Sequence, residues 1–173
     1  MLYSTIASFA LFGATFAAPV TKRDLQTITT SIQSVGTALT ALDTSIKAIK
    51  GPGDAMNVVG MSQMVNQALA DATTKISATQ PITLTDALSL QQSAQTLSTT
   101  ATNTVTDLIA KKDIIFQANA GPLTLQNLQA QKTASDALAK AVVAKVPANV
   151  QSIAQQQTAM ISTSLDKGIA AFQ

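Results

Sequence analysis

The residues from Asp24 to Lys50 constrain the fold more than any other part of this sequence. Large apolar side chains recur there at intervals of alternately three and four residues. They are Leu25, Ile28, Ile32, Val35, Leu39, Leu42, Ile46 and Ile49. On an α-helix this spacing places all of them on one face, over roughly 40 Å at about 1.5 Å per residue. The stretch predicts a long helix whose apolar face must be covered by other helices.

Four later segments show weaker versions of the same spacing, and proline or glycine residues separate them. The breaks fall at Gly51-Pro52-Gly53, Gln80-Pro81, Asn119-Ala120-Gly121-Pro122 and Val146-Pro147. Because proline and glycine end helices, these breaks define the helix limits. The predicted helices after the first run from Asp54 to about Ala78, about Thr85 to Gln117, the Pro122 loop to about Lys145, and Ala148 to Phe172. The pattern predicts an all-α protein, an antiparallel bundle of about five helices.

Pairs of Asp and Lys four residues apart recur in the first four predicted helices. Each pair is expected to add about 0.2–0.5 kcal/mol and to mark a solvent-facing surface. The pairs are Asp43–Lys47, Asp71–Lys75, Asp107–Lys111 and Asp136–Lys140.

The N-terminal residues read as a targeting segment rather than as part of the bundle. Ile6 to Ala18 is an apolar run too short to span a membrane, and it ends in two small residues. We therefore expect residues 1–18 to be a secretory signal peptide and residues 19–23, with the dibasic pair Lys22-Arg23, to be a short propeptide. The functional domain is then 24–173. No transmembrane segment and no C-terminal lipid-anchor signal are expected.

Composition excludes several functions. The chain has no His and no Cys, so imidazole and thiolate chemistry and their metal sites are absent. All nine acidic residues are Asp, and no two lie three or four residues apart on one helix face. Removing residues 1–23 leaves nine basic and nine acidic residues, a neutral domain without an electrostatic basis for nucleic-acid binding. We expect no enzyme activity, no cofactor and no metal.

Polar residues interrupt the apolar faces of the last two predicted helices. Lys132 and Ser135 fall among the large apolar residues of one helix, and Gln157 falls among those of the next. A buried polar group without a partner costs about 1–3 kcal/mol, so Ser135 and Gln157 are candidates to bind the head group of a ligand. Alternatively, Ser135 bonds to its own helix, Gln157 lies at the rim and Lys132 extends to water.

The inner faces of the last three predicted helices carry many Ala residues. Small side chains are compatible with two arrangements, close approach of the helices or an elongated apolar cavity suited to a hydrocarbon chain. If a cavity forms, its walls are expected to be Val35, Leu39, Leu42, Leu69, Leu97, Leu138, Ile161 and Leu165.

The order of these features resembles a known family. The features are Ala17-Ala18-Pro19 followed by Thr21-Lys22-Arg23-Asp24, then Gly51-Pro52-Gly53, Leu123 to Leu138, and Val146-Pro147 through Leu165 to Ile169. Over residues 20–172 the chain resembles the fungal hydrophobic surface binding protein A and cell-wall galactomannoprotein family. The resemblance implies a secreted five-helix domain, extracellular or associated with the cell wall. It also implies binding to apolar surfaces or lipids, with fatty acids enclosed along the bundle in some members.

Two functions follow as expectations. The first is a secreted, non-enzymatic binding protein that holds fatty acids or similar single-chain lipids in an apolar tunnel. The second is a protein that coats hydrophobic surfaces or the cell wall without a discrete ligand site. Saturable binding of one or two lipid molecules distinguishes the first from the second.

Overall fold

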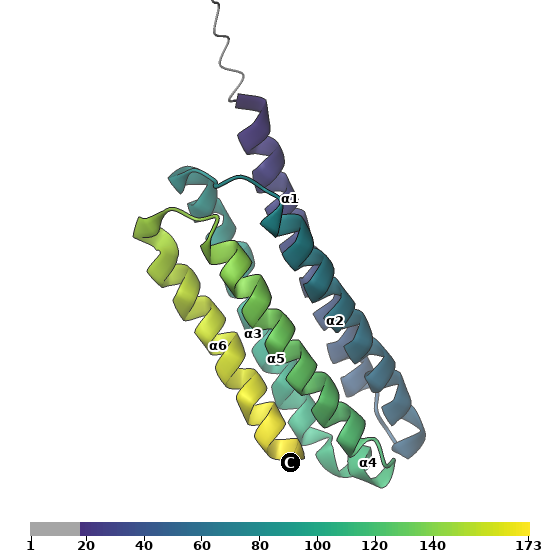
Figure 1. Cartoon of the computed structure of the whole chain (residues 1–173). Coiled ribbons are helices and arrows are strands. Elements are labelled where there is room, and N and C mark those ends of the chain that lie inside the picture. The colour runs from purple at the N-terminus through teal and green to yellow at the C-terminus, as the bar shows by residue number, and fades with distance from the viewer. Residues whose placement is uncertain (1–17) are drawn as a thin grey trace, which may run out of the picture.

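The computed structural model describes the backbone of residues 18–173 and the side chains from residue 22 (Figure 1). These residues form six α-helices and one 3-10 turn, without a strand in the part described, which confirms the all-α prediction. Residues 1–17, the greater part of the predicted signal peptide, lie outside the described residues. The helices are α1 (Ala18–Lys47), α2 (Ala55–Ser77), α3 (Leu84–Ala110), the short α4 (Lys112–Gln117), α5 (Gly121–Val143) and α6 (Ala148–Phe172), and the turn is η1 (Pro52–Asp54).

The five long helices form a closed ring. Each packs against two neighbours, in the cyclic order α1, α2, α5, α6, α3 and back to α1. Successive long helices along the chain run in alternating directions, so the start of α1 and the C-terminus lie at opposite ends of the bundle (Figure 1). Neighbours around the ring that are distant in sequence, such as α1 and α3, run parallel.

The ring arrangement leaves space along its axis. With neighbouring helix axes about 8–10 Å apart, a regular ring of five cylinders leaves an axial hole of roughly 3 Å radius, against roughly 2 Å for a ring of four. Side chains must fill this hole or leave it empty. The size of the residues that point to the axis therefore decides whether the bundle is solid.

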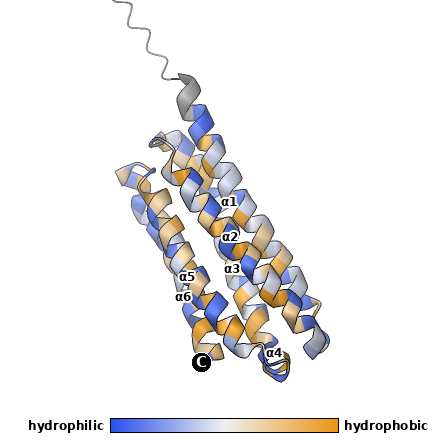
Figure 2. Ribbon diagram, turned by 45° about the vertical axis from the view of Figure 1, so that its right-hand side comes forward, coloured by the Kyte–Doolittle hydropathy of each residue, from blue (hydrophilic) through white to orange (hydrophobic). Residues whose placement is uncertain are grey.

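The apolar residues predicted on the first helix form one wall of the interior. From Ile28 to Ile49 they are all buried, and Leu25, at the end nearest the N-terminus, is half-buried. Hydrophobic and hydrophilic residues alternate along each helix, as expected for helices with one covered face (Figure 2). The buried residues of all five long helices join in a single core.

Most helix limits lie within three residues of the predicted ones, and two differ more. The first helix begins at Ala18 instead of Asp24, because Pro19 lies in the first turn, where its missing N–H group is harmless. Asp24, the expected first residue of this helix, is therefore inside it. The predicted helix from Thr85 to Gln117 is divided at Lys111, whose backbone leaves the helical region (φ −99°, ψ 6°). The Lys111 ammonium group donates a hydrogen bond to the carbonyl of Ile49, 3.0 Å away, which ties this break to the end of the first helix.

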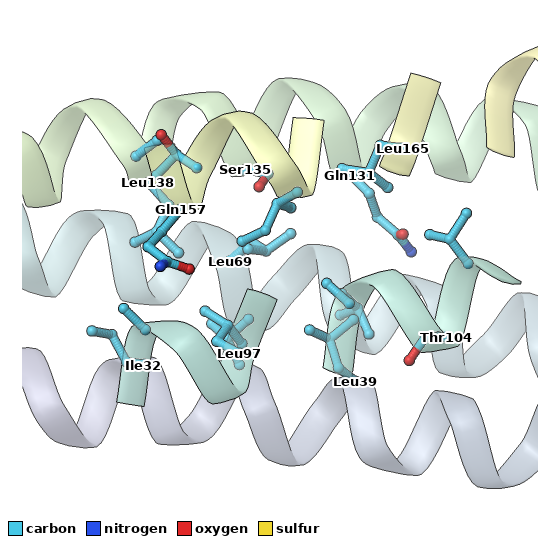
Figure 3. Close-up of a pocket in the computed structure, with 18 of the residues that line it drawn as sticks. Ile32, Leu39, Leu69, Leu97, Thr104, Gln131, Ser135, Leu138, Gln157 and Leu165 are labelled. Atoms are coloured by element: carbon cyan, nitrogen blue, oxygen red, sulfur yellow. The ribbon is translucent and has the colours of Figure 1, made fainter. Parts of the chain in front are cut away.

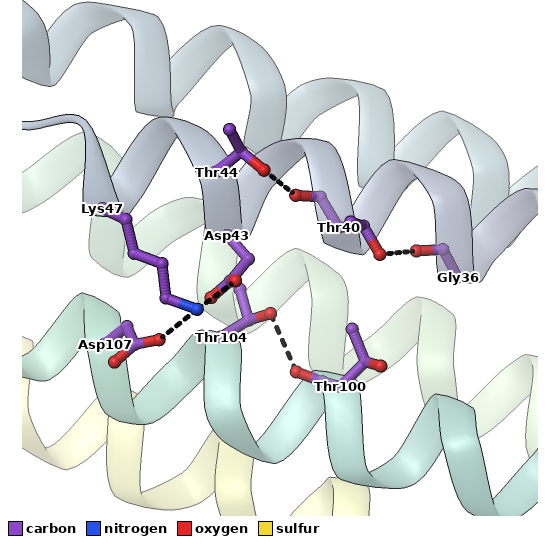
Figure 4. Close-up of polar contacts among 8 residues, drawn as sticks. All are labelled: Gly36, Thr40, Asp43, Thr44, Lys47, Thr100, Thr104 and Asp107. Atoms are coloured by element: carbon purple, nitrogen blue, oxygen red, sulfur yellow. Dashed lines mark hydrogen bonds and ion pairs between the residues drawn. The ribbon is translucent and has the colours of Figure 1, made fainter.

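Only one of the four predicted Asp–Lys pairs forms, Asp43–Lys47 at 2.6 Å. Lys47 also contacts Asp107 of α3 at 3.3 Å, so it links α1 to α3 (Figure 4). Asp107 is thereby engaged away from Lys111, and Asp71 instead accepts a hydrogen bond from Gln67. The prediction of a pair in each helix was wrong, because tertiary partners compete with weak local pairs.

Candidate ligand-binding cavity

An apolar cavity lies on the axis of the ring. All five long helices line it, and it offers about 100 Å³ of space for the centres of water-sized molecules. The wall from α3 extends from Ala94 to Leu108, which corresponds to roughly 20 Å at about 1.5 Å per residue. This length matches an extended hydrocarbon chain rather than a compact ligand.

All ten residues that the sequence indicated for a ligand site line this one cavity. The eight apolar ones are Val35, Leu39, Leu42, Leu69, Leu97, Leu138, Ile161 and Leu165, and the two polar ones are Ser135 and Gln157. Figure 3 shows many of them directed into the same space from different helices. Their contact with a ligand stays a prediction.

Alanine residues explain why the ring is hollow at this level. Ala94 and Ala101 of α3, Ala139 of α5 and Ala154 of α6 all face the cavity. The methyl group of alanine is too short to fill the axial hole, which larger side chains would close. The hole that remains has apolar walls. Of the two arrangements compatible with the sequence, the structure has the cavity.

Five polar side chains interrupt the apolar walls. Three are engaged within the protein: Gln131 donates to the carbonyl of Ser62, and Thr104 (Figure 4) and Thr158 donate to carbonyls of their own helices. The other two, Ser135 and Gln157, make no side-chain hydrogen bond among the described residues. The Oε1 atom of Gln157 is buried without a partner.

The alternative positions given for Lys132 and Gln157 need correction, whereas Ser135 lies at the cavity wall. Lys132 lies outside the cavity and bridges α5 to α6, with its ammonium group 2.7 Å from the Ser162 hydroxyl and 2.9 Å from the Asp166 carboxylate. Gln157 is at the cavity wall rather than at an outer rim. Figure 3 places Gln157 near Leu138, with Ser135 further along the cavity toward Leu165.

Some cavity residues were missed by the sequence reasoning, Gln131 above all. The spacing Leu128, Gln131, Ser135, Leu138 continues the alternation of three and four residues, so the pattern contained a signal for it. Lys132, which was predicted to interrupt the apolar face, lies one position off this line. Thr104 continues the same alternation through Leu97, Ala101, Thr104 and Leu108, so the pattern contained a signal for it as well.

The described residues show neither metal ligation nor a membrane span. No group of three or more acidic side chains is placed to hold a metal ion in this part of the chain. Among the helices from residue 18 onward, none combines the length and the apolar character needed to cross a membrane.

A closed ring of five helices around an apolar, uncharged cavity defines a helical-bundle protein of the ligand-enclosing type. Comparison with known proteins identifies the family. The sequence model of hydrophobic surface binding protein A matches residues 25–144. The chain belongs to the hydrophobic surface binding protein A family, as the resemblance predicted.

Two curated relatives are cell wall mannoproteins of Aspergillus species. Cell wall mannoprotein 1 of Aspergillus flavus is 35% identical over 173 residues, and that of Aspergillus fumigatus is 33% identical over 142 residues. These matches cover 100% and 82% of this chain but only 63% and 50% of the relatives, so the chain corresponds to about half to two thirds of their length.

Solved structures share the fold. Ligand binding domain 1 of Penicillium marneffei MP1 protein, complexed with arachidonic acids, matches with a TM-score of 0.85 and 29% identity. The match covers 87% of this chain and 99% of that domain. Ligand binding domain 2 of the same protein, complexed with multiple arachidonic acids, matches with a TM-score of 0.84 and 29% identity over 87% of this chain and 96% of that one.

Proposed function

We propose that this protein is a secreted, non-enzymatic binding protein that holds a fatty acid or a similar single-chain lipid in the axial cavity. The observation that carries the proposal is the shape and chemistry of that cavity, which is long, apolar and free of charged lining residues. Such a space excludes water and stabilises a hydrocarbon chain through burial of its surface, at about 25 cal/mol per Å². The arachidonic-acid complexes of the similar MP1 domains support this ligand class.

The lipid chain is proposed to lie beside α1, against Val35, Leu39 and Leu42. The remaining walls of the cavity come from the other four helices, through Leu69, Leu97, Leu138, Ile161 and Leu165. Ser135 and Gln157 are proposed to contact the polar end of the lipid, because their side chains have no hydrogen-bond partner within the described residues.

Mass spectrometry of the secreted protein under native conditions tests the proposal directly. We expect one or two copurified single-chain lipids per protein, and saturable uptake of arachidonic acid after delipidation. A protein that carries no lipid and takes up none would contradict it. The same spectra give the mature N-terminus, which we propose follows either residue 18 or the dibasic pair Lys22-Arg23.

Coating of hydrophobic surfaces is the second candidate function. It is supported by the family description and by large apolar side chains exposed on the bundle, among them Leu84, Leu88 and Ile153. Adsorption of this kind increases with the area of a hydrophobic solid and does not saturate at one or two molecules of lipid. The relatives named cell wall mannoproteins support an extracellular or cell-wall location for either function.

A further inference from the structure

A second, smaller apolar chamber continues the axial cavity toward the end of the bundle where α3 and α6 begin. It offers about 50 Å³ for the centres of water-sized molecules. The two spaces are adjacent, because they share five lining residues. The shared residues are Ile32, Ala94, Val142, Ala154 and Gln157.

The outer wall of this end chamber reaches the surface. Leu88 of α3 and Ile153 of α6 line it and are 51% and 37% exposed. Apart from Gln157 and the exposed Gln91, every residue that lines the end chamber is apolar, with Leu90 and Val150 among them. A polar group that binds at Gln157 is therefore in largely apolar surroundings.

Gln157 lies at the junction of the two chambers with an unused hydrogen-bonding group. Its Oε1 atom is buried without a partner, and its backbone carbonyl is 3.5 Å from the Ser98 hydroxyl. A primary amide both donates and accepts hydrogen bonds. A neutral carboxyl group can complete both, because its O–H donates to the amide oxygen while its carbonyl oxygen accepts from the amide N–H. An ionised carboxylate offers no donor to the amide oxygen.

No charged side chain is available to balance a carboxylate at this point. None of the charged residues of α1, α3, α5 and α6 lines either chamber. Lys132 of α5 is paired with Asp166 of α6, and Lys47 of α1 is paired with Asp43 and with Asp107 of α3. Seven other charged residues with described side chains on these helices form no ion pair: Lys22, Arg23, Asp24, Asp86, Asp136, Lys140 and Lys167. The ammonium group of Lys145, directly after α5, is held by the carbonyls of Ser77 and Thr79, and Lys145 lines neither chamber. An unpaired charge in an apolar environment is strongly unfavourable, so the neutral form of the ligand is selected.

We propose that Gln157 binds the carboxyl group of a fatty acid in its protonated form, so that binding strengthens as the pH falls. This inference rests on the proposed lipid-binding function. Above the pKa of the free acid, binding takes up one proton from the solvent, and release returns it. The affinity is then greatest below that pKa and falls about tenfold per pH unit above it, until the pKa of the bound acid is reached. Long-chain alcohols, which stay neutral, belong to the same ligand class.

Calorimetric titration of the delipidated full chain with dodecanoic acid and dodecan-1-ol tests the proposal. We expect the affinity for the acid to fall by at least tenfold between about pH 5 and about pH 9, and the affinity for the alcohol to stay constant. If both affinities are constant, the carboxylate remains in water at the mouth of the end chamber, and the proposal is wrong.

Substitution of the amide provides the second measurement. Gln157→Leu should weaken the acid at low pH and the alcohol by about fivefold to tenfold, and leave dodecane unaffected. Gln156→Leu makes the same change at an exposed position of α6 and should leave all three affinities at their wild-type values. Wild-type affinities in Gln157→Leu overturn the role of Gln157. A wild-type protein that binds none of the three compounds instead contradicts the proposed function itself.

Discussion

Two glycines inside helices have opposite surroundings, and this difference makes a prediction about stability. Gly60 of α2 is exposed, and a Cβ atom there would meet no neighbouring atom within 4 Å. Gly60→Ala should raise the free energy of unfolding by up to about 1 kcal/mol, because alanine restricts the unfolded chain and favours the helix.

At Gly168 of α6 a Cβ would lie 3.0 Å from Val105 and 3.3 Å from Leu128. Gly168→Leu should therefore lower the free energy of unfolding by about 1–3 kcal/mol, because the larger side chain overpacks this contact. Denaturant unfolding measures both changes.

The carboxylate of Asp54 makes stability depend on pH in the acidic range. It accepts hydrogen bonds from the backbone N–H groups of Lys50 (3.0 Å) and Gly51 (3.2 Å), and these bonds lower its pKa, with the Lys50 bond the larger cause. A carboxyl group with a lowered pKa stabilises the fold above its unfolded pKa, and the effect disappears as the pH falls through the folded pKa. The melting temperature of Asp54→Ala should lie below that of the wild type at neutral pH. The difference should shrink below about pH 4, and a difference that stays constant would show that the charge is not involved.

At the scale of the helices, proline and glycine made most boundaries predictable. The predicted start of the last helix at Ala148 is the observed one, because Val146-Pro147 interrupts the chain immediately before it. The break at Lys111 was not predictable, because no proline or glycine marks it and a contact with the distant Ile49 carbonyl accompanies it. Local signals act within a few residues, whereas a contact between segments far apart in sequence depends on the finished fold.

One lysine connects two loops at the end of the bundle where α3 and α6 begin. The Lys145 ammonium group donates to the carbonyls of Ser77 and Thr79, and the Lys145 carbonyl accepts from the N–H of Ile82 at 2.9 Å. Lys145 thus holds the connection between α2 and α3 against the end of α5. Lys145→Met keeps the backbone bond and removes the side-chain ones, so we expect a loss of about 1 kcal/mol after allowance for partial exposure.

Lys140 supplies the control for this substitution. It lies in the last turn of α5, five residues before Lys145, and its predicted pair with Asp136 does not form. Lys140→Met should change the free energy of unfolding by less than about 0.5 kcal/mol in the same denaturant titration. Equal effects of the two substitutions would show that the Lys145 contacts do not stabilise the loop.

For the whole molecule, the sequence predicted which residues share a surface better than it predicted how helices are ordered. The predicted cavity residues came from apolar faces, and any closed bundle directs those faces to its axis, so Leu39, Leu97 and Leu165 meet there. The cyclic order of the helices was not accessible, because it depends on contacts such as that between α2 and α5, which no local pattern encodes. The hollow interior depends on the closure of five helices into a ring, since a ring of five leaves more axial space than a ring of four.

The last prediction tests whether the axial cavity is the place where lipid binds. Leu97→Trp and Leu138→Trp each add volume to the cavity wall, and the empty space reduces the usual overpacking penalty of about 1–3 kcal/mol. We expect each variant to retain a melting temperature close to that of the delipidated wild type and to bind much less arachidonic acid. A bound lipid stabilises the native state in proportion to the logarithm of its concentration over Kd, so the increase in melting temperature on adding the lipid should also be smaller.

Leu123→Trp adds the same side chain at an exposed position of α5 that is 43% accessible, and it should bind lipid as the wild type does. Adsorption to a hydrophobic solid should change little in all three variants, because that process uses the outer surface. If both cavity variants are stable and bind arachidonic acid with wild-type affinity, the lipid does not occupy the axis of the ring. Adsorption on the outer surface would then explain the interaction with lipids better than an enclosed chain.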